Sequence, residues 1–234
     1  NSRLLVNYKN VEKLFFTAYK IDKKQQIKLN KTYKFEDKKA FINTLKNIKT
    51  WQHTLRNEDD YLQHTTEVIV PKFKNGMYLI VASENETLQE NSIYGTTTIQ
   101  VTNLTLVENT FEGTYNYQVV DRNTGKPIKK AKIHLKNKVF KNTNYINKKL
   151  ITDKTGFATF KSDEIYRNVN ISVTTKNDFA TFGNHYLYDY SSVNYNKKED
   201  EVNEEEVLEQ TEDEAQKPEK KKEEKEIPIK ISRG

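Results

Sequence analysis

The residues best suited to chemistry in this 234-residue chain are two histidines and three acids between positions 53 and 64. His53 and His64 flank Glu58, Asp59 and Asp60, and imidazole and carboxylate groups both bind divalent metals. No HxxH or HxH spacing places two ligands on one element, and the acids lack the spacing of a calcium loop. Adjacent acids on a strand or loop also point apart, so they form no acid–base pair. We expect no metal site and no catalytic pair here.

Other catalytic classes lack the residues they need. The chain contains no cysteine, which removes disulfides, thiolate metal sites, cysteine nucleophiles and internal thioesters. It has no GxSxG motif and no glycine-rich phosphate loop. His134 lies between Ile133 and Leu135 on the outward phase of a predicted strand, where a solvated histidine is the usual finding. The sequence therefore predicts no catalytic residue, no cofactor and no enzyme activity.

Three tyrosines form the one candidate interaction surface. Tyr186, Tyr188 and Tyr190 alternate, so on a strand their side chains would share one face. Such a face could stack on sugar rings, or it could pack on the first domain. Both interpretations stay open.

The elements that position these residues are predicted to be strands. Apolar residues alternate with polar ones on both sides of the turn Asn123-Thr124-Gly125, and a second turn lies at Asp153–Gly156. Glycine supplies the positive φ of tight turns, and the preceding Asp or Asn can bond its own backbone. Period-2 apolarity indicates strands with one buried face. The apolar residues beside the first turn are Tyr117, Val119, Ile133 and Leu135.

A first unit of about 100 residues combines strands with one helix. Phe41, Leu45 and Ile48 form a helical stripe that begins near Asp37, and Trp51 is expected to pack this helix or its loop against the sheet. The predicted strands cover residues 3–8, 13–21, 65–70, 77–83 and 96–101.

A second unit follows a hinge at residues 102–104. Seven short strands separated by turn signals are typical of an immunoglobulin-like sandwich, although the Cys pair and buried Trp of true immunoglobulin domains are missing. These strands are predicted near residues 104–109, 114–121, 128–136, 148–152, 157–161, 169–176 and 179–186.

The expected fold class is all-β, with two consecutive antiparallel β-sandwich domains. The first covers residues 1–103 and includes the short helix, and the second covers 104–195. Residues 196–234 form a charged, flexible linker, because they contain too few large apolar residues to offset the entropy of ordering. Only residues 227–231 look like the start of a further element.

Charge is unevenly distributed along the chain. Residues 197–226 contain 14 Asp or Glu and 7 Lys or Arg, whereas residues 1–196 contain 30 Lys or Arg and 19 Asp or Glu. A basic body could bind nucleic acid, but its lysines alternate with buried-type residues on predicted strands, as on a solvated sheet face. Arginine is scarce and no recognition helix is evident. We expect no nucleic-acid partner, and no apolar run is long enough to span a membrane.

Four segments carry a resemblance to a known family. The chain resembles the N-terminal macroglobulin-like (MG) domains of large bacterial alpha-2-macroglobulin family proteins, in the version common in Bacteroidetes. The matching features are Pro71 before a Gly76-x-Tyr78 strand, the hinge Val101–Leu104, and the paired strands from Asp121 to Ala131. The segments are WQHTLRNEDDYLQHTTEVIVPKFKNGMYLIVAS, TTTIQVTNLTLV, YNYQVVDRNTGKPIKKAKIHL and TDKTGFATF.

This resemblance implies a structural role. It indicates a non-catalytic segment of a large extracytoplasmic protein, periplasmic or at the cell surface and anchored through the parent protein, that traps or inhibits proteases. Its partners would be neighbouring domains of the same polypeptide, together with proteases. The thioester of some members needs a cysteine, so this chain does not encode covalent capture. The alternative function is a cell-surface adhesion or glycan-binding module that uses Tyr186, Tyr188 and Tyr190.

Overall fold

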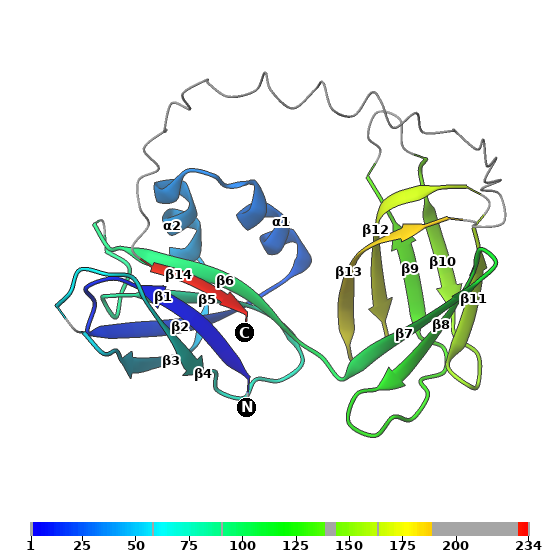
Figure 1. The fold of residues 1–234 in the computed structure, drawn as a ribbon, viewed down its shortest axis with the longest axis horizontal. Helices are drawn as coiled ribbons and strands as arrows, with labels where there is room; N and C mark the ends of the chain where they lie inside the picture. The colour runs from blue at the N-terminus through cyan, green and yellow to red at the C-terminus, as the bar shows by residue number, and fades with distance from the viewer. Residues whose placement is uncertain are drawn as a thin grey trace, which may run out of the picture.

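The chain folds into two β-rich bodies joined between β6 and β7 (Figure 1). The computed structural model describes residues 2–57, 59–89, 91–138, 144–162, 164–188 and 229–233. Within these residues, no helix has the length and apolarity needed to cross a bilayer.

The first body contains two antiparallel sheets and two helices. One sheet has the strand order β14-β1-β4 and the other has the order β3-β2-β5-β6. Its elements are β1 (Arg3–Tyr8), β2 (Lys13–Ile21), α1 (Lys23–Lys31), α2 (Phe35–Asn43), β3 (Asn47–Thr54), β4 (His64–Ile69), β5 (Gly76–Ser83), β6 (Tyr94–Val101) and β14 (Ile229–Arg233).

The four-stranded sheet is buried on both faces. One face packs on the smaller sheet around Leu14, Phe16 and Ile80, all of which are fully buried. The other face packs against α1 and α2, whose Leu29 and Ile42 join a separate apolar cluster. This double cover explains why β2 reads as a nearly continuous apolar run rather than a strict alternation.

Two elements of the first body differ from the sequence-based expectation. The predicted helix corresponds to α2, and α1 is an additional helix that was not predicted. A capping box begins α1, in which the Asp22 carboxylate accepts from the Gln25 N–H at 2.8 Å. The predicted helical stripe ends early, because α2 stops at Asn43 and Ile48 lies in β3. Trp51 lies in β3, and its ring stacks on that of Phe16 with the ring centres 5.3 Å apart. It therefore packs between the two sheets and does not pack a helix against the sheet.

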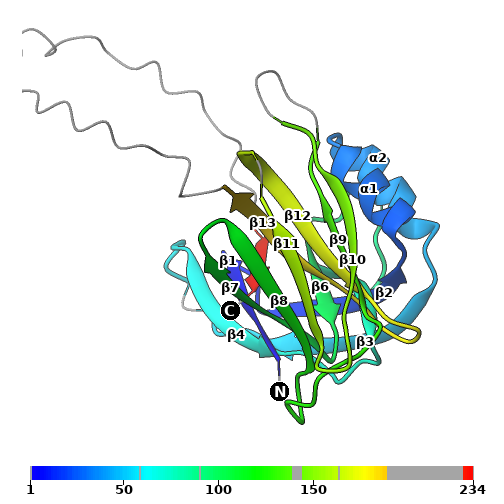
Figure 2. The ribbon, with the colours of Figure 1, turned by 90° about the vertical axis from the view of Figure 1, so that its right-hand side faces the viewer.

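The second body is a sandwich of seven strands. Its sheets have the orders β10-β9-β12-β13 and β11-β8-β7, and Figure 2 shows them as neighbouring layers. Its strands are β7 (Leu104–Phe111), β8 (Thr114–Asp121), β9 (Lys132–Lys136), β10 (Asn147–Ile151), β11 (Phe157–Lys161), β12 (Tyr166–Thr174) and β13 (Phe179–Leu187).

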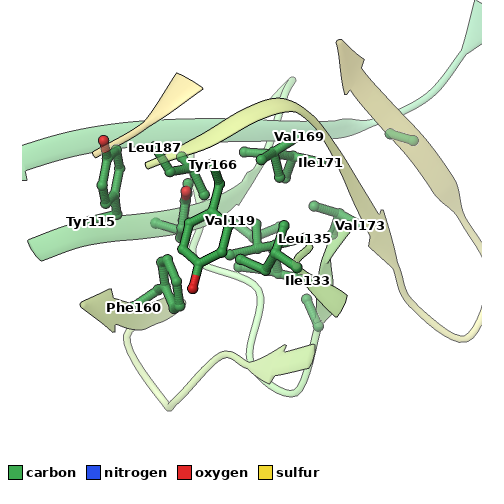
Figure 3. Close-up of a cluster of buried hydrophobic side chains, with 14 of the residues drawn as sticks. Tyr115, Val119, Ile133, Leu135, Phe160, Tyr166, Val169, Ile171, Val173 and Leu187 are labelled. Atoms are coloured by element: carbon green, nitrogen blue, oxygen red, sulfur yellow. The ribbon is translucent and has the colours of Figure 1, made fainter. Parts of the chain in front are cut away.

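Side chains from both sheets form one core in the second body. Figure 3 shows Val119 of β8, Ile133 and Leu135 of β9, and Ile171 of β12 converging in this core. All four are fully buried, as the period-2 alternation predicts. The all-β, two-sandwich fold class is therefore confirmed.

The two predicted turns form as expected. The Asp121 carboxylate accepts from the Thr124 hydroxyl and from the N–H groups of Thr124 and Asn123, and these bonds lower the pKa of Asp121. Asp153 binds its own turn in the same way. Gly156 has φ of +77°, and a Cβ there would lie 2.7 Å from the Val119 carbonyl oxygen, so only glycine fits.

The end of the chain returns to the first body. Residues 229–233 form β14, an edge strand that pairs antiparallel with β1 over five residue pairs. Residues 229–231 of the apolar signal at 227–231 lie in this strand, inside the range 196–234 that was expected to be a linker. The rest of the predicted linker, up to residue 228, lies outside the described residues. The boundaries drawn at 103 and 195 stay predictions.

Removal of β14 is expected to destabilise the first body selectively. In a chain that ends at residue 228, one edge of β1 loses its backbone hydrogen bonds to β14. A ladder of five residue pairs holds about five hydrogen bonds, so at roughly 1 kcal/mol per net bond the loss should be on the order of 5 kcal/mol. Hydrogen exchange should accelerate at β1 and β4 amides while β9 and β12 amides keep their protection. A deletion of residues 205–209, which shortens the connection but keeps β14, is the control. Equal exchange at β1 in both variants would contradict the role of β14.

Alkaline pH is expected to weaken the contact between α2 and the sheet. Burial, with a smaller effect of the Glu36 charge, raises the pKa of Tyr94 to about 12, and its hydroxyl donates to the Phe35 carbonyl at 2.8 Å. The folded state holds the neutral phenol, so this stabilisation is complete below pH ~10 and is lost as the pH rises through about 12. Urea unfolding between about pH 9 and pH 12 should show a smaller decline for Tyr94→Phe than for the natural chain. Tyr33→Phe, which removes an exposed phenol, should keep the full decline, and identical slopes in both variants would sink the assignment.

Candidate functional site

The contact between the two bodies is the most organised polar site in the structure. The turn between β12 and β13 ends at Asp178, whose backbone N–H donates to the Thr175 hydroxyl at 3.1 Å. This places the Asp178 side chain at the tip of the hairpin, facing the first body. We call the contact between this tip and the first body the joint.

One carboxylate oxygen of Asp178 accepts three hydrogen bonds from two other parts of the chain. Its Oδ2 accepts hydrogen bonds from Asn75 Nδ2 at 2.7 Å, Thr102 Oγ1 at 3.0 Å and the Asn103 N–H at 2.8 Å. Asn75 precedes β5, and Thr102 and Asn103 form the predicted hinge between β6 and β7. Hydrogen bonds to a carboxylate are stronger than neutral ones, so the hinge is held in one geometry.

A second set of hydrogen bonds lies beside the first. Gln100 of β6 accepts from the Thr181 N–H at 2.8 Å and from the Thr181 hydroxyl at 3.1 Å through Oε1, and its Nε2 donates to the Thr181 carbonyl at 3.3 Å. The side-chain amide thus pairs with β13 as a backbone amide of a neighbouring strand would. The Lys23 ammonium of α1 also lies 5.9 Å from the centre of the Phe179 ring. Asp178 and Gln100 together fix both the distance and the rotation between the bodies.

The three predicted surface tyrosines are only partly placed. Tyr186 lies on β13 and is 59% exposed. Tyr188 is half-buried, and its N–H donates to the Tyr115 hydroxyl at 2.8 Å, which ties the end of β13 to β8. Tyr190 lies outside the described residues, so the shared tyrosine face stays a prediction.

The histidines are distributed over separate places. His64 Nε2 lies 2.9 Å from Asp60 Oδ1, and His134 Nε2 lies 2.6 Å from Asn147 Oδ1. His185 Nδ1 lies 3.2 Å from Glu108 Oε2 at the edge where β13 meets β7. A bond from the Leu62 N–H, and then one from His64, lower the pKa of Asp60. In the described part of the chain, no three histidine or acid side chains gather as metal ligands.

A small cavity lies beside the end of α2. Its volume is about 170 Å³, and its lining includes Phe15, Tyr19, Leu45, Ser83 and Leu88. Ligand pockets are typically ~300–1,000 Å³, so this cavity offers little room for a substrate.

The joint went unrecognised in the sequence because its residues are common polar types. Asp178, Gln100 and Asn75 follow no motif, and they meet only after both bodies have folded. The one usable signal was the hinge itself, predicted at residues 102–104 between two strand patterns.

Comparison with known proteins identifies the fold but no close relative. No protein-family model matches the chain, and no curated protein matches it. A crystal structure of native alpha-2-macroglobulin from Escherichia coli spanning domains MG0-NIE-MG1 is similar, with a TM-score of 0.56 and 10% identity. The match covers 78% of this chain and 58% of that one, so this chain spans little more than half of it. A shorter fragment spanning NIE-MG1 matches with a TM-score of 0.51 and 10% identity, over 76% of this chain and 86% of that one. The chain therefore shares the fold of macroglobulin-domain fragments.

Removal of the Asp178 carboxylate is expected to loosen the joint without unfolding either body. Asp178→Ala leaves three donors without their acceptor, a loss of roughly 2–3 kcal/mol at the joint. Residual dipolar couplings of the two bodies should then fit two alignment tensors instead of one, while the core amides keep their protection. Asn177→Ala changes an exposed neighbour in the same turn and should retain a single tensor. A single tensor in both variants would show that Asp178 does not hold the bodies.

Proposed function

We propose that this chain is a non-catalytic structural segment of a large extracytoplasmic alpha-2-macroglobulin-like protein that takes part in protease trapping or inhibition. The observation that carries the proposal is the fold shared with fragments of Escherichia coli alpha-2-macroglobulin. The Bacteroidetes version of the family is a finer proposal that rests on the sequence segments around Pro71, Gly76 and the strand pair from Asp121 to Ala131.

The joint suits a segment that positions its neighbours. The joint contains one charged group, the Asp178 carboxylate, which accepts three hydrogen bonds from the first body and the hinge. Its other hydrogen-bonding groups are neutral: Asn75, Gln100, Thr102 and Thr181. The second body is also attached at both ends, through the hinge at 102–103 and through the connection to β14. Such a pair of sandwiches supplies fixed geometry and surface to adjacent domains of the same polypeptide.

The protease role can be tested with the chain and with the polypeptide that contains it. The chain alone is expected to leave trypsin and elastase fully active on a small chromogenic peptide, because it contributes shape and no inhibitory group. The parent polypeptide should protect a large protein substrate while the small peptide is still cleaved, as enclosure requires. Stoichiometric inhibition by the chain alone would indicate a direct inhibitor instead. Equal cleavage of both substrates with the parent present would remove the protease role.

A second candidate function is glycan binding, and the exposure of Tyr186 favours it. An aromatic ring that is 59% exposed on a sheet is available to stack on a sugar. A glycan array probed with the natural chain and with Tyr186→Ala decides the matter. Binding that the substitution abolishes supports an adhesion module, and an array without signal removes it.

A further inference from the structure

The outer face of one sheet in the second body has an unusual charge distribution. The strands of the sheet β10-β9-β12-β13 contain no Asp or Glu, although such residues number 33 in the chain. In contrast, Lys132 and Lys136 of β9 are both exposed, and they lie on the opposite side of the strand from the buried Ile133 and Leu135.

The strand register brings a third lysine onto the same face. Lys149 of β10 lies directly opposite His134, which lies between Lys132 and Lys136 on the outward side of β9. On the other neighbour of β9, the outward positions are Asn170, Ser172 and Thr174 of β12, all uncharged. We call Lys132, His134, Lys136 and Lys149 the basic face. Among the described residues, none of its three lysines forms an ion pair.

An acidic segment of the same chain follows this sheet directly. Residues 199–214 contain ten Asp or Glu and no Lys or Arg. They begin eleven residues after Tyr188, the residue that follows β13. Eleven residues can reach up to ~36 Å, whereas the four strands of the sheet span roughly 14 Å. The basic face is therefore within reach of the segment.

The end points of the connection also favour this route. The joint holds the start of β13 beside Asp178, and the far end of β13 points away from the first body (Figure 1). The chain must nevertheless return to the first body, because β14 pairs there with β1. The connection therefore starts from the second body, which carries the basic face, and ends at the first.

We propose that the basic face is a polyanion-binding surface and that residues 199–214 of this same chain occupy it. Lysines spaced on one sheet face attract a run of carboxylates without any need for a fixed hydrogen-bond pattern. The attachment through residues 189–198 raises the local concentration of the segment to the millimolar range or above, which makes a weak contact effective. The interaction is electrostatic and solvent-exposed, so it weakens as salt is added.

The test measures binding of a labelled peptide of residues 199–214 to full-length chains by fluorescence anisotropy. A neutral-segment chain, with the ten acids changed to Gln or Asn, has no occupant of its own. At about 50 mM salt it should bind the peptide at least ~10-fold more tightly than the natural chain does. Raising the salt to about 500 mM should remove most of that binding.

Variants of the basic face locate the contact. In the neutral-segment chain, Lys132→Glu, Lys136→Glu and Lys149→Glu together should weaken peptide binding at least ~10-fold. The matched control is Lys126→Glu, Lys154→Glu and Lys161→Glu, an equal charge change at exposed positions outside this sheet, which should cost less than about threefold. If the reversed trio fails to fold, Lys132→Gln, Lys136→Gln and Lys149→Gln should give the same direction with a smaller loss.

Three outcomes overturn the proposal. Equal peptide binding by the natural and neutral-segment chains means that residues 199–214 do not occupy the face. Equal losses in the two lysine trios mean that binding follows net charge alone. Vesicles containing phosphatidylglycerol form the third arm: if the natural chain binds them as tightly as the neutral-segment chain, and only the basic-face variant loses that binding, the face belongs to a membrane surface.

Discussion

The carboxylate of Asp178 receives three hydrogen bonds from two segments that are distant from it in the sequence, and it lies where the two bodies meet. A short connection of two residues would by itself leave the bodies free to rotate. The carboxylate removes this freedom because it engages the connection and a loop of the first body together. Gln100 adds a second point of attachment, and two points separated along β13 define an orientation. The relative placement of the sandwiches therefore depends on a few polar contacts rather than on a shared apolar core.

Each body meets its burial requirement in a different way. The second body is a two-layer sandwich with one core, and its strands alternate between buried and exposed positions. The first body has three layers, because α1 and α2 cover the outer face of the larger sheet and create a second apolar cluster. The exposure of charged side chains also differs between the two bodies. The sheet of the second body that lacks acids leaves its lysines exposed, whereas the four-stranded sheet of the first body is covered on both faces.

The sequence indicates the strands well and the long-range contacts poorly. Alternation located β1, β2 and β5, and the turn signals located the tight turns after β8 and β10, because these signals act between near neighbours in the sequence. Each of these turns joins a strand of one sheet to a strand of the other, so neither closes a hairpin. β3 was not predicted, because most of its residues are exposed and the segment shows little apolar alternation. α1 escaped because its only buried residue is Leu29, although the capping box at Asp22 and Gln25 was readable. The joint and the pairing of β14 with β1 depend on residues that meet only in the folded molecule, so no local pattern could indicate them.

The pairing of β1 with β14 also determines the order in which the chain can fold. The two strands are separated by 220 residues, so β14 completes the sheet that contains β1 only after everything between them has been synthesised. The second body has all of its strands within residues 104–187 and can form its core while the ribosome still holds the rest. Until β14 has been synthesised, one edge of β1 presents unpaired amide and carbonyl groups of the kind that recruits other chains into aggregates. The first body thus matures after the second, and its vulnerable period lasts through translation of the residues between β1 and β14.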